Sequence, residues 1–269
     1  MIFKKKPKTV TDIERNIEKK KKKKLFSVPH VTVILMLLIL LAYGWQNYVY
    51  YTEGKWVARD AFHDYAFSLE NILDGNLLVF ITSIFLHAGP DHLVLNLIAL
   101  FFFGKAVEDS LGWKKTLMVF FAGAIVGNLA VLSASLLGLM PIDAVTIGAS
   151  GAIFGLLGVS MLVDPLDIVI YPYIIPLPLI LIAVIYMIYN IGAFVSSVLT
   201  GASSDIAYIA HIGGLLAGML IGFKIEGKRK GIMILLGILG IMILIPIFWE
   251  TISYLESYNY IGAFTEIFG

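Results

Sequence analysis

The chain has 269 residues, of which 59% are hydrophobic and 14% are charged, and its mean hydropathy is +0.88. A soluble domain of this length needs more charge on its surface, so the composition excludes an ordinary soluble protein and indicates a polytopic membrane protein. The net charge of +1 gives no reason to expect a nucleic-acid partner, and the absence of cysteine excludes disulfides, thiolate metal sites and cysteine catalysis.

The chain begins with a basic segment. It carries KKKPK at 4–8 and an unbroken lysine run from Lys19 to Lys24. No small-residue cleavage site precedes the first apolar run, so we do not expect a cleaved signal peptide. We expect residues 1–28 to form a solvated cytoplasmic tail that can contact anionic headgroups.

Apolar runs follow along the rest of the chain, and a helix needs roughly 20 such residues to cross the bilayer core. The runs lie near 31–50, 91–111, 115–138, 150–163, 168–191, 206–223 and 231–249. The fourth run is short and rich in glycine, so we expect its helix to begin inside the membrane. The sequence therefore predicts an all-α, polytopic membrane helix bundle with six spans and a seventh span at the C-terminus.

Basic residues orient these spans, because they collect in cytoplasmic loops. The lysine-rich tail, Lys114, Lys115 and the segment 224–230 fall on one side of the membrane if the first span runs outward. The segments on the other side, 51–80, 139–149 and 193–205, carry only Lys55 and Arg59. We therefore expect a multi-pass protein of the cell membrane with a cytoplasmic N-terminus. Segment 51–80 is long and acidic, and we expect it to form an interfacial element.

Two polar residues lie inside the apolar runs. Ser150 belongs to the stretch GASG at the outer start of the fourth run, and His211 lies about a turn and a half into the sixth run. Both spans would descend from the outside, so the two side chains share a depth. Glycine stripes would let the two helices approach closely and bring Ser150 and His211 within reach. The stripes are Gly151, Gly155 and Gly158 in the fourth run and Gly214, Gly218 and Gly222 in the sixth.

A serine beside a histidine is typical of nucleophilic catalysis. The hydroxyl is a weak nucleophile until a base takes its proton, and a neutral imidazole can take it. Asp205 lies nearly two turns from His211, so the sequence predicts a Ser–His dyad rather than a triad. Phe154, one turn below Ser150, could stack on the imidazole. The alternative is that Ser150 only packs helices and that His211 is a buried histidine bonded to a hydroxyl or carbonyl.

The stretch FLHAGPDHLVLN holds a further polar group. His92 and Asn96 are spaced i,i+4 and share a helix face at the outer end of the second run, whereas His87 lies before that helix. Metal binding is disfavoured because no acidic residue joins that face. The functional interpretation is an oxyanion hole, to which the backbone amide of Ser150 would add a donor. The alternative is interfacial histidines and an asparagine that bonds a neighbouring helix.

Together, these residues resemble the rhomboid family of intramembrane serine proteases. The matching stretches are LHAGPDHLVLN (86–96), FGKAVEDSLG (103–112), GASGAIFG (148–155) and AHIGGLLAG (210–218), and their order and spacing match over roughly 80–224. The resemblance implies that Ser150 is the nucleophile and His211 the general base. It also implies that His92 and Asn96 donate to the oxyanion and that Gly148 opens the loop before Ser150.

The resemblance also covers residues that hold the helices together. Glu108 matches an acidic residue that is structural in the family. Gly214 and Gly218 match glycines that let the sixth span pack on the fourth, where Gly151 and Gly155 lie.

The chain departs from the family pattern in places. Phe154 stands where many members have a tyrosine, which removes a hydroxyl and keeps the stacking ring. Leu78 and Val79 precede Thr82 where Trp-Arg often occurs, which changes the contacts expected inside the first outer loop. The seventh span occurs in only part of the family.

We therefore expect an intramembrane endopeptidase that cleaves single-pass transmembrane proteins near their outer membrane boundary, through an acyl-enzyme and without a cofactor or metal. The resemblance implies substrate entry past the fifth span, with loop 193–205 as a cap. The expected domains are the tail 1–28, a rhomboid core at 29–224, and a basic linker, seventh span and short outer tail at 225–269. A non-catalytic relative that binds transmembrane helices and a small-solute transporter are the alternatives.

Overall fold

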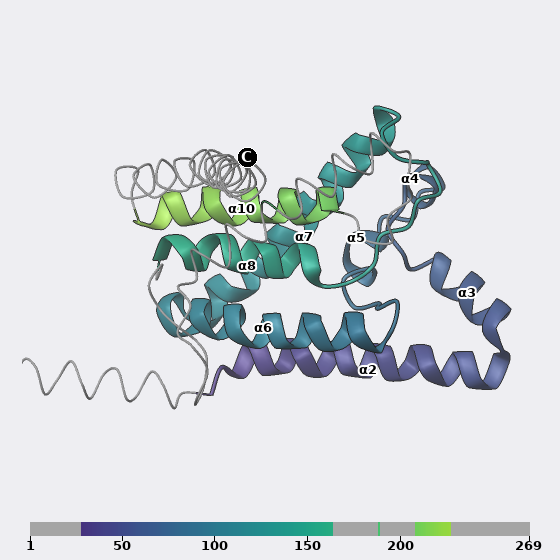
Figure 1. The fold of residues 1–269 in the computed structure, drawn as a ribbon, viewed down its shortest axis with the longest axis horizontal. Helices are drawn as coiled ribbons and strands as arrows, with labels where there is room; N and C mark the ends of the chain where they lie inside the picture. Colours follow the sequence, from purple (N-terminus) through teal and green to yellow (C-terminus); the bar gives the residue numbers. More distant parts are fainter. Residues whose placement is uncertain (1–27, 164–187, 189–207, 227–269) are drawn as a thin grey trace, which may run out of the picture.

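The structure is a computed structural model that describes residues 28–163, 188 and 208–226. Within these residues every regular element is a helix, and one isolated antiparallel bridge joins Phe67 to Thr146. The helices are α2 (His30–Glu53), α3 (Lys55–His63), α4 (Leu69–Leu73), α5 (Val79–Thr82), α6 (Pro90–Leu111), α7 (Trp113–Leu136), α8 (Ser150–Val163) and α10 (Tyr208–Glu226) (Figure 1). The prediction of an all-α fold is confirmed for this part of the chain.

Three of the described helices are long and apolar enough to cross a membrane: α2, α7 and α10, the last of them over Tyr208–Ile225. α8 is apolar but has only 14 residues, as the short fourth run led us to expect. The protein is therefore a helical membrane protein. The predicted fifth span apart from residue 188, loop 193–205, the seventh span and the basic tail lie outside the described residues, so the number of spans remains a prediction.

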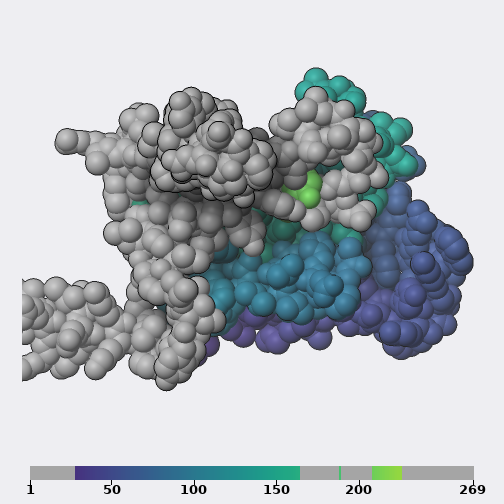
Figure 2. Space-filling view, in the orientation of Figure 1, coloured from purple at the N-terminus to yellow at the C-terminus, as the bar shows by residue number. Residues whose placement is uncertain are grey.

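α8 lies at the centre of the bundle. It packs most extensively on α10, and then on α7 and α6 (Figure 1). Every residue from Gly151 to Leu162 is buried. A helix that is covered on all sides needs no polar face, which explains why this stretch is apolar or small all round. α2 packs on the far side of α6, and these two helices lie together on one face of the molecule (Figure 2).

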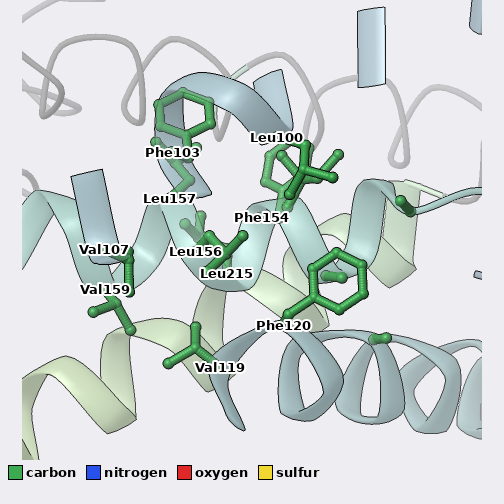
Figure 3. Packing of buried hydrophobic residues seen from close by; sticks show 14 of the residues in the cluster. Leu100, Phe103, Val107, Val119, Phe120, Phe154, Leu156, Leu157, Val159 and Leu215 are labelled. Atoms are coloured by element: carbon green, nitrogen blue, oxygen red, sulfur yellow. The ribbon is translucent and has the colours of Figure 1, made fainter. Parts of the chain in front are cut away.

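A large cluster of apolar side chains fills the interior of the bundle between these helices. Lipid tails are as apolar as leucine, so close packing rather than removal from water holds membrane helices together. Figure 3 shows the cluster, with Leu100, Phe103 and Val107 from α6, Val119 and Phe120 from α7, Phe154, Leu156, Leu157 and Val159 from α8, and Leu215 from α10.

Glycines let α7, α8 and α10 approach until their backbones touch. We call Gly123 and Gly127 of α7, Gly151 and Gly155 of α8, and Gly214 and Gly218 of α10 the glycine seam. A Cβ atom on Gly214 would collide with the carbonyl oxygen of Gly151, and a Cβ atom on Gly218 would collide with that of Gly155. A Cβ atom on Gly155 would also lie 2.9 Å from the Cα of Gly123 in α7. The seam therefore sets the spacing of the three helices.

A carboxylate from α6 caps the start of α2. Glu108 accepts hydrogen bonds from the backbone N–H groups of Val31 and Thr32, at 3.0 and 2.9 Å, and from the Thr32 hydroxyl at 2.8 Å. The first N–H groups of a helix have no partner inside the helix, and the positive end of the helix dipole favours a negative charge there. Glu108 thus ties the last turns of α6 to the first turn of α2.

The acidic segment after α2 folds into short helices. α3, α4 and α5 occupy most of residues 55–82, so the expected interfacial element is helical. The segment also contacts the chain just before α8: Phe67 pairs with Thr146, and the backbone N–H of Gly148 donates to the carbonyl oxygen of Ser83 at 2.8 Å. These bonds hold the loop that leads into Ser150.

Candidate active site

Ser150 and His211 lie on the two helices that pack most closely together. Ser150 is the first residue of α8, and His211 is in the first turn of α10. The distance between His211 Nε2 and Ser150 Oγ is 2.7 Å, which is a short hydrogen bond. His211 is 8% exposed and Ser150 is half-buried. The structure therefore brings together the pair that the two glycine stripes predicted would meet.

Aromatic rings hold the imidazole of His211 from two sides. The ring of Phe154 stacks on it, with 4.5 Å between ring centroids and an angle of 7° between the planes. Tyr208, one turn before His211, meets the imidazole edge to face at 6.2 Å and 88°. The stacking of Phe154 on the imidazole was predicted from the sequence. Tyr208 was missed, although its i,i+3 spacing from His211 could have indicated it.

No carboxylate accompanies the pair on its own helices. α8 contains no acidic residue, and α10 contains none before its last residue. Within the described residues, the rings of Phe154 and Tyr208 contact the imidazole of His211.

The loop before Ser150 lies against the start of α6. Gly148 has a φ of +115°, a conformation that L side chains rarely adopt. A Cβ atom there would lie 2.8 Å from Cε1 and 2.9 Å from Nε2 of His92, and 3.8 Å from Nδ2 of Asn96. Position 148 therefore requires glycine for two reasons, the positive φ and the close approach of the His92 ring. This contact brings both predicted oxyanion donors to the loop that carries Ser150.

Local hydrogen bonds orient the two side chains of α6. The backbone N–H of Ala88 points at Nδ1 of His92, with 3.4 Å between the nitrogens, so Nδ1 accepts and Nε2 carries the ring proton. Asn96 is 6% exposed and donates from Nδ2 to the backbone oxygen of His92 at 2.9 Å. Its amide has a second N–H bond, so both residues can offer a donor to a ligand beside Gly148.

His87 lies outside this donor pair, in the loop that precedes α6. Its ring centroid is 5.1 Å from that of His92, and its Nδ1 lies 3.2 Å from the backbone oxygen of Phe85. Burial, and to a lesser degree the nearby His92 ring, lower the pKa of His87 to about 4. His87 is therefore neutral at physiological pH. Among the described residues, no group of three or more His, Asp or Glu side chains is placed to hold a metal ion.

Replacing Gly148 with alanine is expected to reduce peptide-bond hydrolysis about tenfold or more, because the methyl group both strains the backbone and pushes the His92 imidazole away. Gly138→Ala is the matched control. Gly138 also has a positive φ, of +72°, but a Cβ atom there meets nothing within 4 Å. Both variants should lose thermal stability through backbone strain, Gly148→Ala somewhat more because of the contact with His92, and only Gly148→Ala should lose kcat. Equal kcat in the two variants would contradict a role for the contact with His92.

Known proteins resemble this chain over the same region. A family model described as Rhomboid domain matches residues 74–228. The Bacillus subtilis protein named "Putative rhomboid protease YdcA" is 31% identical over 200 residues, which cover 74% of this chain and 90% of that protein. RHOMBOID-like protein 12, mitochondrial, of Arabidopsis thaliana is 29% identical over 181 residues, covering 63% of this chain and 52% of that protein. Rhomboid protease GluP of Bacillus subtilis is 33% identical over 160 residues, covering 60% of this chain and 28% of that protein.

Proposed function

The chain belongs to the rhomboid family and is a rhomboid intramembrane serine protease, and from this premise we propose that Ser150 and His211 are its catalytic dyad. The observation that carries the proposal is the hydrogen bond of 2.7 Å between Ser150 Oγ and His211 Nε2. A nucleophile and its base must lie within such a distance for the proton to move as the nucleophile attacks.

The chemistry proceeds in two steps through an acyl-enzyme. His211 Nε2 takes the proton of Ser150 as Oγ attacks the carbonyl carbon of the scissile bond, and the carbonyl oxygen becomes an oxyanion. The oxyanion collapses, the C–N bond breaks, and His211 gives its proton to the leaving amine. Water then attacks the ester, again with His211 as the base, and hydrolysis releases the new carboxyl end and restores Ser150.

Three donors are proposed for the oxyanion. They are the Nε2–H of His92, the second amide N–H of Asn96 and the backbone N–H of Ser150. The last lies at the first residue of α8, where the helix dipole also favours negative charge. The absence of a side chain at Gly148 leaves the space in which the oxyanion would form.

Replacing Asn96 with alanine is expected to lower kcat about 10²-fold with little change in KM, because the lost donor acts mainly on the charge of the transition state. Steady-state cleavage of a transmembrane substrate by purified protein would measure both constants. Thermal unfolding of the same preparation shows whether the variant is folded. A raised KM at unchanged kcat would remove Asn96 from the oxyanion role.

We also propose that the site opens toward the outer face of the cell membrane. The starts of α6, α8 and α10 lie at the end of the bundle that carries α3, α4 and α5 (Figure 1). That end holds Lys55 and Arg59, whereas Lys114 and Lys115 lie where α7 begins, at the opposite end. In the sequence, the lysine-rich tail directly precedes α2. This distribution supports a cytoplasmic N-terminus.

The proposed substrate is a single-pass transmembrane protein that is cut near its outer boundary. A substrate helix hides its peptide bonds in internal hydrogen bonds, so it must unwind locally before Ser150 can reach a carbonyl. Helix-destabilising and small residues beside the scissile bond would make this easier. Lateral entry past the predicted fifth span, with loop 193–205 as a cap, is part of the same proposal.

The function is tested by incubating detergent-purified protein with a model transmembrane substrate and mapping the cut by mass spectrometry. The substrate carries glycine and small residues near one end of its span, and a matched version carries leucine at those positions. Cleavage within that end of the first substrate, and much slower cleavage of the second, would support the proposal. No cleavage, or cuts only outside the span, would reject it.

A further inference from the structure

A glutamine in α2 holds the backbone of the loop that precedes α6. The side-chain oxygen of Gln46 accepts from the N–H of His87 at 3.0 Å, and its amide nitrogen donates to the carbonyl oxygen of the same residue at 3.3 Å. Both residues are buried, at 8% and 2% exposure, and they are 41 positions apart in the chain. We call this pair of bonds the Gln46 clamp.

Gln46 continues a stripe of α2 that faces the protein. The buried residues of this helix are Thr32, Leu35, Ile39 and Gln46, at the spacing of one helix face. An amide at the last of these positions is costly to bury unless both its oxygen and its nitrogen are bonded, and the clamp bonds both. The side chain therefore contributes hydrogen bonds at a position where an apolar residue would serve for packing alone.

One further hydrogen bond connects the clamped loop to the proposed oxyanion site. Ala88 follows the clamped residue, and its backbone N–H points at Nδ1 of His92. A neutral imidazole has two forms, with the proton on either nitrogen, and an N–H aimed at Nδ1 selects the form with the proton on Nε2. Nε2 and the neighbouring Cε1 are the ring atoms that lie against Gly148. The position of Ala88 thus decides whether His92 can donate there.

We propose that Gln46 is a positioning residue for His92. The clamp fixes the loop 87–89, the Ala88 amide fixes the tautomer and plane of the His92 imidazole, and Nε2–H is thereby directed at the developing oxyanion. This inference rests on the proposed oxyanion role of His92. It assigns a part in the reaction to a residue outside the matched stretches 86–96, 103–112, 148–155 and 210–218.

Gln46→Leu is expected to remain folded, because the loop before α6 borders a cavity. A cavity of about 950 Å³ lies between the outer end of α2, α3 and the residues before α6, and Gln46 and His87 both line it. Water in this cavity can bond to the N–H and C=O of His87 once the amide is removed. We therefore expect a folded protein in which the loop is no longer held in one place.

The first experiment reads the tautomer of His92 directly. Protein labelled with ¹⁵N-histidine is reconstituted in lipid bilayers, and the ring nitrogens of His92 are assigned by comparison with His92→Gln. Wild type should show one form with the proton on Nε2, and Gln46→Leu should show both forms. Asn47→Leu is the matched control, because within the described residues the Asn47 amide bonds to its own helix, at the Tyr43 carbonyl, at 2.8 Å. An unchanged single form in Gln46→Leu would overturn the proposal.

The second experiment asks whether the effect passes through His92. Gln46→Leu should lower kcat about tenfold at similar KM, less than the loss of a donor outright, and Asn47→Leu should match wild type. In a His92→Ala background, Gln46→Leu should cause no further fall in kcat. The same fold-loss in both backgrounds would overturn the proposal. Gln46→Met, which fills nearly the same volume, replaces the leucine variant if the latter does not fold.

The two experiments also separate this inference from the proposed function. If wild-type protein cleaves no transmembrane substrate, the proposed function fails, while the ring-nitrogen spectra still decide whether Gln46 controls His92. If wild type cleaves and the spectra of Gln46→Leu are unchanged, the inference fails and the proposed function stands.

Discussion

Replacing Ser150 with alanine is expected to abolish peptide-bond hydrolysis and to leave the helix bundle folded. The change removes the Oγ atom that lies 2.7 Å from His211 Nε2 and keeps the Cβ atom that packs at the start of α8. Loss of the nucleophile in a serine protease lowers kcat by about 10⁴-fold or more. Loss of one hydrogen bond at a half-buried position changes the free energy of unfolding by only about 1 kcal/mol.

Covalent labelling tests directly whether Ser150 is the nucleophile. A fluorophosphonate probe reacts with an activated serine, so it should modify wild type and fail to modify Ser150→Ala. His211→Ala should also lose labelling, since the hydroxyl then lacks its base. Ser160→Ala is the matched control on the same helix, because the Ser160 hydroxyl is buried and donates to the Leu157 carbonyl at 2.9 Å.

The labelling experiment has clear contrary outcomes. Equal labelling of Ser150→Ala and wild type would show that another residue is the nucleophile. Loss of labelling in Ser160→Ala at unchanged thermal stability would point to that hydroxyl instead. Circular dichroism and thermal unfolding of each variant separate loss of chemistry from loss of fold.

Replacing Gly214 with valine is expected to abolish activity by moving α10 away from α8. A Cβ atom on Gly214 would collide with the carbonyl oxygen of Gly151 and would lie 3.3 Å from the oxygen of Gly123. These are backbone atoms, so no side-chain rotation can make room, and whole helices must shift. Overpacking of this kind costs about 1–3 kcal/mol of stability, and a displacement of about 1 Å at a catalytic group costs about 10² in rate.

His211 lies one turn before Gly214 on the same helix, so the shift acts directly on the base. We expect loss of kcat of about 10²-fold or more, together with a lower unfolding temperature. Gly214→Ala should show the same defects in milder form. Gly44→Val is the matched control, since a Cβ atom on Gly44 in α2 meets nothing within 4 Å. Wild-type activity in Gly214→Val would show that the glycine seam does not set the catalytic geometry.

Helix positions and helix faces could be read from the sequence. The apolar runs 31–50, 91–111 and 115–138 correspond to α2, α6 and α7 within a few residues at each end. Local rules suffice for this, because the thickness of the bilayer sets the length of a span and 3.6 residues per turn set its faces. The same periodicity placed Phe154 one turn from Ser150, and His211 one turn from Gly214.

Other contacts between distant segments could not be read from the sequence. Gln46 and His87 are 41 positions apart, and the side chain of Gln46 bonds the backbone of His87. A contact made by one side chain has no repeating pattern in the sequence from which it could be predicted. Glu108 matched a structural acidic residue, but its partners at the start of α2 became visible only in the fold. Segment 51–80 carries few long apolar runs, so its short helices depend on contacts such as that between Phe67 and Thr146.

The sequence by itself determined that this is a helical membrane protein, which helices carry Ser150, His211 and His92, and which face of each helix they occupy. Only the tertiary structure decided that Ser150 Oγ and His211 Nε2 lie 2.7 Å apart, that Tyr208 joins Phe154 around the imidazole, and that Gly148 lies against His92. The reason is physical: periodicity and hydropathy act along one helix, whereas these distances depend on how closely the backbones of α7, α8 and α10 approach, and the glycine seam sets that approach.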